Sequence, residues 1–312
     1  MSWQNLFTKV FAWFDNSNVK ITDNVGESID WMRVIPFILM HLVCLLVLVV
    51  GWSPVALWVA LASYLLRMFA ITAFYHRYFS HKSFKTSRFA QFLFGVLGAT
   101  ATQRGPIWWA SHHRRHHIYS DKDKDIHSPR KGFLWSHMGW FLCLKNFSTQ
   151  EHCVRDLFKF PELVLLDRFD TLVPIIYGFF MLFLGQYLEY AYPELHTNGS
   201  QMLIWGYFVS TIVLIHCTLF INSLAHVWGR QRYQTGDDSR NNGFLALITM
   251  GEGWHNNHHH YPASTRQGFF WWEIDMSYYL LRLMALFGII WDLKPVPANR
   301  LYSNLIQKEA QS

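Results

Sequence analysis

The chain carries little charge for its length of 312 residues. Asp, Glu, Lys and Arg make up only 15% of it, while hydrophobic residues make up 51%. Soluble proteins average about 25% charged residues. No charged residue occurs between Val34 and Leu66, and no Lys or Arg occurs between Arg168 and Arg230. These gaps argue against an ordinary soluble domain and predict segments that span a membrane.

Cysteine is also scarce, and the absence of certain motifs excludes several kinds of site. The 4 cysteines are scattered, which predicts no disulfide framework, and none of them lies near a histidine cluster. Structural zinc and iron–sulfur sites are therefore not expected. The sequence HExxH does not occur, so a zinc protease is not expected either.

The uncharged stretches predict four membrane helices arranged as two hairpins, because a spanning helix needs about 20 apolar residues. The expected spans are Val34–Gly51, Pro54–Ala73, Leu172–Tyr190 and Gln201–Ile221. Basic residues are frequent between the two hairpins and after the second one. By the positive-inside rule, both termini and all histidine clusters are expected in the cytoplasm.

The charges that remain also bear on possible partners. The net charge of +6 fits a cytoplasmic face beside anionic lipid, so no nucleic-acid partner is expected. Arg67 lies inside the second expected span, where a cation must snorkel, pair or line a site.

Histidine is the abundant residue that matters most, with 17 copies. Three clusters read HRYFSH (His76 to His81), HRRHH (His113 to His117) and HNNHH (His255 to His259), and a fourth motif, NSLAH, runs from Asn222 to His226. Imidazole is a good ligand for iron, zinc, copper and nickel. The clusters hold more imidazoles than one ion can use, which predicts a site for two metal ions.

The spacing within the clusters gives them a helical phase. On an α-helix, His113, His116 and His117 share one face, and the HNNHH histidines repeat this pattern. Asn222 and His226 also share a face. His76 and His81 do not, so we expect a helix to end there or the two side chains to face different metal ions.

Other histidines are expected to lie outside the site. His260 falls off the helical face of its cluster, and His112 lies at the edge of its own. The isolated histidines are expected to be surface or hydrogen-bonded residues. They are His41, His137, His152, His196 and His216.

The ligand chemistry points to a reaction type. An all-imidazole site for two ions beside a bilayer suits iron that handles dioxygen. The apolar, aromatic surroundings suggest a long apolar substrate, and unactivated C–H bonds need an oxidising metal centre rather than acid–base chemistry.

These motifs, in this order, resemble the membrane fatty-acid desaturases of the Δ9 type. The segments Gly236–Pro262 and Trp271–Lys294 are also similar to that family, and the resemblance covers roughly residues 30–295. It implies an all-α membrane protein with four transmembrane helices and a cytoplasmic helical cap. It further implies a di-iron centre that uses dioxygen and two electrons to form a cis double bond, with Δ9 as the expected position.

The resemblance also implies a ligand set. The expected iron ligands are His76, His81, His113, His116, His117, His226, His255, His258 and His259, with Asn222 binding through a water. Carboxylates are expected to orient the imidazole rings. The candidates are Asp121, Asp125, Asp237, Asp238 and Glu252. Arg240, Asn241 and Asn242 are expected to brace the third cluster.

The sequence is compatible with two acyl carriers. Animal acyl-CoA desaturases have Arg-Asp just before the second cluster, where this chain has Ser111-His112. Arg130 and Lys131 do match the family and are candidates for binding a head group. Acyl-CoA and membrane phospholipid therefore both remain as expected substrates.

The sequence divides into five expected parts. They are an N-terminal cytoplasmic segment (1–33), a first hairpin (34–73), a first cap segment (74–170), a second hairpin (171–226) and a second cap segment (227–312). A bacterial-type inner membrane is expected. The haem signature HPGG of a fused cytochrome b5 is absent. Electrons are therefore expected from a separate ferredoxin, rubredoxin or cytochrome b5 with its reductase, attracted by the basic face.

Three other interpretations remain. A hydroxylase of the same histidine-cluster class could share the ligands, although alkane hydroxylases typically have a Glu inside the first and third clusters, and this chain has none there. A membrane metal carrier should place polar ligands through the depth of the bilayer. A loose metal-scavenging tract should lack the repeated helical phase.

Overall fold

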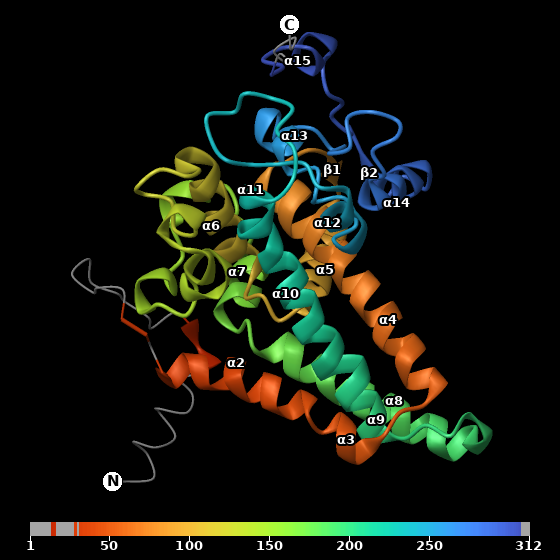
Figure 1. Cartoon of the computed structure of the whole chain (residues 1–312). Helices are drawn as coiled ribbons and strands as arrows, with labels where there is room; N and C mark the ends of the chain where they lie inside the picture. Colours follow the sequence, from red (N-terminus) through yellow and green to blue (C-terminus); the bar gives the residue numbers. More distant parts are fainter. Residues whose placement is uncertain (1–13, 17–27, 30, 307–312) are drawn as a thin grey trace, which may run out of the picture.

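The structure is a computed structural model that describes residues 14–16, 28, 29 and 31–306 (Figure 1). Most of the expected N-terminal segment, residues 1–33, lies outside these residues. The described chain is mostly helical, as predicted. Its one sheet within that part is an antiparallel pair of two-residue strands, β1 (Lys85–Thr86) and β2 (Ile290–Trp291).

The first apolar stretch forms α2 (Trp31–Cys44) and α3 (Val47–Val50), followed by a sharp turn and α4 (Pro54–Phe69). The Ser53 side chain caps α4 by accepting a hydrogen bond from the Ala56 N–H, and Pro54 occupies the first helical position. The chain then continues without a break into the π-helix η2 (Ala70–Ser80).

The second apolar stretch forms α8 (Leu172–Ala191) and returns through η7 (Pro193–Leu195). The returning arm consists of four successive segments. They are α9 (Gly199–Gln201), η8 (Met202–Val209), α10 (Ser210–Asn222) and α11 (Leu224–Val227).

Three continuous helical stretches are long and apolar enough to cross a membrane: Pro54–Ser80, Leu172–Ala191 and Gly199–Val227. The helical stretch Val34–Val50 is apolar but shorter. The chain is thus a membrane protein by the length and composition of its helices.

The remaining helices are shorter and flank the histidine clusters. They are α5 (Arg88–Ala99), α6 (Pro106–Tyr119), η3 (Pro129–Lys131), η4 (Trp135–Gly139), η5 (Leu144–Asn146), η6 (Glu151–Cys153), α7 (Pro161–Arg168), α12 (Gly243–Ile248), α13 (His255–His260), α14 (Met276–Leu286) and α15 (Ala298–Leu301).

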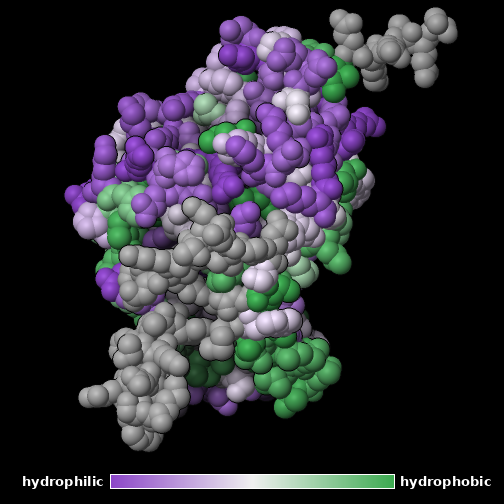
Figure 2. All heavy atoms as spheres, turned by 90° about the vertical axis from the view of Figure 1, so that its left-hand side faces the viewer, coloured by the Kyte–Doolittle hydropathy of each residue, from purple (hydrophilic) through white to green (hydrophobic). Residues whose placement is uncertain are grey.

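The long helices and the short ones occupy opposite ends of the molecule. In Figure 1, α4 and α10 rise from the lower end, and α6 and α13 lie beyond their upper ends. The face in Figure 2 is hydrophilic over its upper part. At its lower end, the part that grey atoms do not cover is hydrophobic. This division places the histidine-bearing segments where the apolar helices meet the polar part of the protein.

The main core lies around η2 and fixes its position. Phe74 stacks on Phe94 of α5 with ring centroids 3.8 Å apart and the planes nearly parallel. Tyr75 is fully buried, and its hydroxyl donates to the carbonyl oxygens of Gly95 and Arg104. Since these contacts come from residues beside His76, the core also orients the first histidine cluster.

Arg67 is fully buried, so it does not snorkel. Its guanidinium donates to the hydroxyls of Ser210 and Thr211 and to the carbonyl oxygens of Ser63 and Thr100. Neutral acceptors rather than a carboxylate thus satisfy this cation, and they tie α4 to α10 and to the end of α5.

Gly98 offers a test of how tightly this core is packed. A Cβ atom at this position would lie 2.0 Å from Cε1 of Tyr75, which cannot move because it is fully buried. We expect Gly98→Ala to destabilise the protein by about 1–3 kcal/mol through overpacking. The measurement is the melting temperature in detergent. Gly243→Ala is the control, since its Cβ would make only an ordinary 3.7 Å contact; equal melting temperatures for the two variants would contradict the expectation.

Candidate metal centre

The π-helical form of η2 brings His76 and His81 to the same side of the helix, although they are five residues apart. The backbone N–H of His81 donates to the carbonyl oxygen of His76 at 3.2 Å, an i to i+5 bond. Residues five apart therefore stack on one side of the turn. The expectation that a helix ends at this point is confirmed, because η2 ends at Ser80. The structure contradicts the alternative that the two side chains face different metal ions, because both belong to the same cluster.

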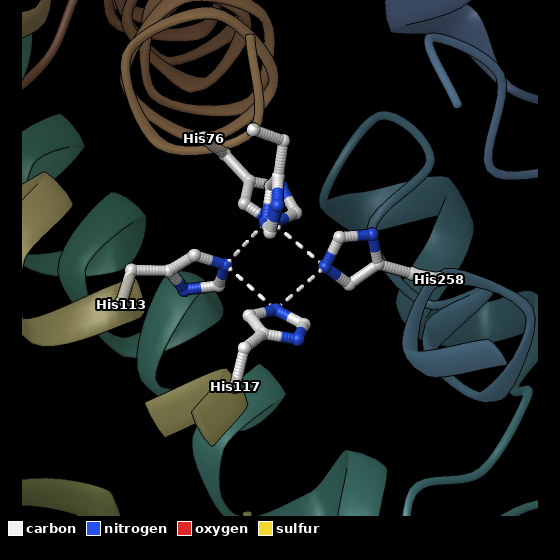
Figure 3. A group of neighbouring side chains, drawn as sticks. His76, His113, His117 and His258 are labelled. Carbon is white, nitrogen blue, oxygen red and sulfur yellow. Dashed lines mark hydrogen bonds between the residues drawn. The ribbon is translucent and has the colours of Figure 1, made fainter. Parts of the chain in front are cut away.

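Five imidazoles form the first cluster, which joins three of the four sequence motifs. Its members are His76, His81, His113, His117 and His258. Their Nε2 atoms approach one another in a chain, from His76 to His258 (3.1 Å), His117 (2.9 Å), His113 (3.0 Å) and His81 (2.8 Å). Figure 3 shows four of these rings turned toward a common centre.

Four imidazoles form the second cluster, directly beside the first. Its members are His116, His226, His255 and His259. The Nε2 atoms of His226 and His255 lie 3.0 Å apart. The rings of His117 and His259, one from each cluster, have centroids 4.6 Å apart.

The two clusters divide each helical motif in the same way. The i, i+4 pair His113 and His117 points into the first cluster, whereas His116 points into the second. On α13 the pair His255 and His259 faces the second cluster and His258 faces the first. All nine imidazoles that the family resemblance implied are thus brought together.

Buried carboxylates hold the outer nitrogens of four rings. Asp121 lies 2.8 Å from Nδ1 of His226, Asp125 lies 3.0 Å from that of His116, and Asp237 lies 2.7 Å from that of His259. Glu252 contacts Nδ1 of His76. Since each Nδ1–H donates to a carboxylate, each Nε2 keeps its lone pair for the centre.

The same contacts set the charge of these carboxylates. Burial alone raises the pKa of Asp121, Asp125 and Asp237, but the hydrogen bonds and charge of the histidines outweigh it. The pKa of each is therefore lowered, and all three are ionised at neutral pH.

Most of the imidazoles are neutral, as metal ligands must be. Burial lowers the pKa of His113, His117 and His258 well below the usual value, and it lowers that of His259 to about 4 even though Asp237 acts in the opposite direction. His116 is the exception. Burial lowers the pKa of His116, but the charge and hydrogen bond of Asp125, together with the charges of Asp121 and Asp237, outweigh burial and raise this pKa above its usual value.

The unpaired nitrogens fit two metal ions. Nε2 of His116 and Nε2 of His259 are buried and have no hydrogen-bond partner among the residues that the structure describes, and both belong to rings anchored at Nδ1. In the first cluster, the five Nε2 atoms lie close to one another, and one shared cation would bind all of them. Nine nitrogen donors with almost no carboxylate among them suit iron, zinc or copper.

Several residues of the centre carry no signal in the sequence. Gln267 donates from Nε2 to Glu252 (3.0 Å) and lies 3.2 Å from Nδ1 of His76. The buried Arg77 pairs with Glu252 and with Asp275. Gln267 and Asp275 follow the third cluster in an irregular segment, where no period or motif singles them out.

His127 is another residue of the site that the sequence did not predict. It is buried, and its ring centroid lies 4.2 Å from that of His116, next to Asp125. Burial lowers its pKa to about 3. Its position two residues after Asp125 was a signal, but the histidine stands alone in the sequence.

The asparagines explain why the third cluster reads HNNHH. The Asn257 side chain accepts a hydrogen bond from the Asn241 amide (2.7 Å), and its backbone N–H donates to Asn241. Asn256 accepts from the backbone N–H groups of Arg232 and Tyr233. Asn241 therefore braces α13 as expected, and the non-ligand face of that helix is fixed by amides.

Asp238, a candidate for orienting an imidazole ring, and Lys131, a candidate for binding a head group, lie away from the clusters. His112 and His260 were expected outside the clusters and lie there. Asp238 contacts no histidine of the clusters; its exposed side chain pairs with Arg130 at 2.7 Å. Lys131 is exposed and lies over the ring of Trp135. His112 turns away from the clusters to the carbonyl oxygen of Asn146 (2.9 Å), and His260 turns to that of Arg300 (2.7 Å).

Three of the isolated histidines form a chain of their own. Nε2 of His41 lies 2.9 Å from Nε2 of His216, and Nδ1 of His216 lies 2.9 Å from Nε2 of His137. His137 in turn contacts the Ser223 hydroxyl at 3.1 Å. They are hydrogen-bonded residues, as expected, and they join α2, η4 and α10.

Two cavities meet at the metal centre. The smaller one, of about 40 Å³, is lined by His76, His116 and His255. The larger one, of about 240 Å³, extends toward α2 between mostly apolar and aromatic side chains. Trp109 and Asn222 line both cavities, so Asn222 lies beside the clusters.

Comparisons with known proteins agree with this geometry. The family model for fatty acid desaturases matches residues 31–293. A probable chloroplastic lipid desaturase of Arabidopsis thaliana is 33% identical over 94% of this chain and 78% of its own length. An acyl-CoA 5-desaturase of Anemone leveillei is 36% identical (92% and 88%), and an sn-1 stearoyl-lipid 9-desaturase of Anabaena variabilis is 32% identical (88% and 97%). A membrane protein with nine converging imidazoles and these relatives is an enzyme of the desaturase type, and the chain belongs to the fatty acid desaturase family.

Proposed function

We propose that this protein introduces a cis double bond, at the Δ9 position, into a saturated long-chain fatty acyl group. The reaction converts –CH2–CH2– to –CH=CH–, and it reduces one dioxygen to two waters with two external electrons and two protons. The observation that carries the proposal is the convergence of nine imidazoles into two adjacent clusters at the end of an apolar cavity. The Δ9 position is supported by the 9-desaturases among the relatives.

The two histidine clusters would each hold one iron ion. The first cluster supplies five imidazoles, and the second supplies four with Asn222 binding through a water. When bound, the di-iron centre supplies the oxidising power that an unactivated C–H bond requires. The carboxylates Asp121, Asp125, Asp237 and Glu252 keep the rings oriented and balance part of the positive charge.

The larger cavity would hold the acyl chain. Its walls include Phe37, Met40, Phe141 and Ile215, which exclude water from the chain. Trp109 lies where the cavity meets the first cluster, with its ring stacked on His113 at 5.1 Å. An acyl chain in this cavity would pass His113 of the first cluster and Asn222, which would position its carbons beside the metal centre.

The proposal includes a membrane arrangement. Val34–Val50 would be the fourth span beside the three longer ones, and both termini and the metal centre would face the cytoplasm, in a bacterial-type inner membrane. The described parts would then be the hairpins 34–73 and 171–226 and the cap segments 74–170 and 227–306. A ferredoxin, rubredoxin or cytochrome b5 would supply electrons at the basic cytoplasmic face.

The fatty-acid profile of a desaturase-deficient host tests the reaction. Expression of the chain should produce a cis-9 monoene from saturated C16 or C18 chains, measured by mass spectrometry with localisation of the double bond. His258→Ala should abolish it, because His258 belongs to the first cluster. His260→Ala, on the same helix but outside the clusters, should leave the product. Hydroxylated chains in place of the monoene would assign the protein to the hydroxylases.

Metal content tests the two-ion centre separately. We expect about two iron ions per chain in the purified protein, measured by mass spectrometry of the elements. Asp121→Asn should reduce this number toward one, because His226 loses the carboxylate that orients it, and such outer partners are worth about 10–100-fold in metal affinity.

Asp238→Asn is the matched control for this experiment. The exposed side chain of Asp238 pairs with Arg130 and contacts no histidine of the clusters, so its variant should keep both ions. Melting temperatures would show whether Asp121→Asn is still folded. A folded Asp121→Asn protein with unchanged iron content would contradict the assignment of His226.

The electron-donor surface makes a third prediction. Lys122 and Lys124 are exposed in the turn between Asp121 and Asp125, the two carboxylates that hold His226 and His116 of the second cluster. Lys122→Glu should slow reduction by an acidic donor several-fold at low ionic strength, because steering depends on charge complementarity. Lys159→Glu makes the same charge change at another exposed position. Stopped-flow reduction that is equally slow in both variants would place the docking site elsewhere.

A further inference from the structure

Three histidines outside the metal centre form a continuous hydrogen-bonded chain. Nε2 of His41 lies 2.9 Å from Nε2 of His216, and Nδ1 of His216 lies 2.9 Å from Nε2 of His137. Nδ1 of His137 in turn lies 3.1 Å from the Ser223 hydroxyl. Since His216 turns its two ring nitrogens to different partners, the three rings do not direct their lone pairs at one point, as a metal ion would require. The arrangement is therefore a chain rather than a set of metal ligands.

Two of the three rings belong to apolar helices. His41 lies in the helical stretch Val34–Val50, and His216 lies in the stretch Gly199–Val227, which is long enough to span a membrane. His137, on η4, is only 5% exposed. Ionisable residues within membrane helices are rare, and chains of them mark proton relays. The histidine chain therefore lies where titratable groups usually have a function.

The neutral chain has one hydrogen too few for its contacts. Both of its ends are backbone carbonyl oxygens, which can only accept: that of Phe37 lies 2.8 Å from Nδ1 of His41, and that of Leu219 lies 3.0 Å from the Ser223 hydroxyl. Each neutral imidazole offers one hydrogen, and so does the hydroxyl, so the contacts outnumber the hydrogens by one. A single added proton would give every contact its hydrogen.

Aromatic rings lie beside the chain. Phe37 contacts the ring of His41, and Phe133 and Phe220 contact that of His137. Among the described residues, no Asp, Glu, Lys or Arg forms a hydrogen bond or an ion pair with any of the three rings. An added proton would therefore be shared along the chain rather than fixed by an ion pair.

The titratable groups on the neighbouring helices have other partners. The buried Arg67 of α4 donates to two hydroxyls near the start of α10. Cys217 contacts Tyr64 of α4, and Cys44 donates to a backbone carbonyl oxygen of its own helix at 3.3 Å. These contacts leave the imidazoles as the groups that would carry the charge.

The Ser223 hydroxyl gives the chain an outlet. It has a single hydrogen and two acceptors within reach, Nδ1 of His137 and the Leu219 carbonyl oxygen. Leu219 and Asn222, the residue before Ser223, line the larger cavity. Burial and the neighbouring His216 lower the pKa of His137 below its usual value, so this end of the chain gives up a proton readily.

We propose that His41, His216 and His137 are a proton reservoir, which holds one proton and passes it through the Ser223 hydroxyl to the cavity beside Asn222. This inference deepens the proposed function and rests on it. Reduction of dioxygen to two waters consumes two protons, and an acyl chain in the cavity would exclude the solvent that could supply them.

Release of the proton is a series of short shifts along the chain. The hydroxyl hydrogen of Ser223 leaves toward the dioxygen under reduction, and the hydrogen on Nδ1 of His137 replaces it. The hydrogens behind it each move across one contact, and the chain ends neutral with Ser223 donating to His137. The electrons come from the external donor. Water reloads the chain through the same hydroxyl when the acyl product has left the cavity.

Nitrogen-15 NMR of histidine-labelled protein tests the reservoir without turnover. The sample is the full chain in detergent, loaded with zinc as a diamagnetic substitute for iron, and the signals are assigned by replacing His41, His137 and His216 in turn. We expect the three rings to take up one proton in total between about pH 8 and pH 5, because a second charge on the same chain is repelled by the first. Uptake of no proton, or of more than one, would overturn the proposal.

Ser223→Ala tests the outlet. The measurement is the single-turnover rate of product formation when dioxygen is added to the reduced, iron-loaded protein, with stearoyl-CoA and distearoyl phosphatidylcholine as the two substrates offered. We expect this rate to fall about 100-fold, the lower end of what a positioned proton donor contributes. Ser223→Thr keeps a hydroxyl and should restore most of the rate.

Ser136→Ala is the matched control. This hydroxyl lies next to His137 in the sequence, but it donates to the Phe133 carbonyl oxygen at 3.0 Å and takes no part in the chain. The variant should keep the rate of the unmodified protein. An unchanged rate in Ser223→Ala would overturn the proposal, and so would a slow Ser223→Thr, because the loss would then come from packing rather than from the hydroxyl.

The proposed function fails by a different result, namely the absence of a His258-dependent monoene in cells. The NMR titration does not depend on that product. A single shared proton on the three histidines of a protein that makes no monoene would reject the reaction while the proton site stands.

Discussion

The structure depends on keeping nine imidazole lone pairs directed at two small volumes. Without partners at their outer nitrogens, neutral imidazole rings would rotate and form hydrogen bonds with one another in many orientations. The carboxylates of Asp121, Asp125, Asp237 and Glu252 prevent this for four rings, because each fixes which nitrogen carries the proton. The carboxylates are then held in turn: Glu252 contacts Arg77 and Gln267, and these interactions reach the irregular segment beyond the third cluster.

Backbone geometry supports the same arrangement. The π-helical turn places His76 and His81 on one side of η2, and the stacked aromatic rings of Phe74 and Phe94 hold that turn against α5. On α13 the clustered histidines occupy one side, while Asn256 and Asn257 bind the opposite side to neighbouring loops. The rigid surroundings keep the donors in place before any ion binds, which lowers the cost of metal binding.

The two cavities share a wall beside the histidine clusters. Trp109 and Asn222 belong to both of them. In the proposed function, the position of an acyl chain in the larger cavity would therefore be fixed relative to the clusters, and this would set the position of the double bond.

The sequence determined the membrane character and the two helical motifs, which follow from local properties: a run of apolar residues and the angle between residues on one helix. The set of nine imidazoles came from the resemblance of the histidine motifs to a known family. The sequence could not decide how the imidazoles divide between the clusters, because His76 and His258, 182 positions apart, meet only in the folded chain. The α-helical phase also failed for His76 and His81, because the surrounding packing stabilises a π-helix there. The places of Gln267 and His127 beside the clusters were decided by the tertiary structure alone, since isolated side chains acquire their partners only when distant segments pack together.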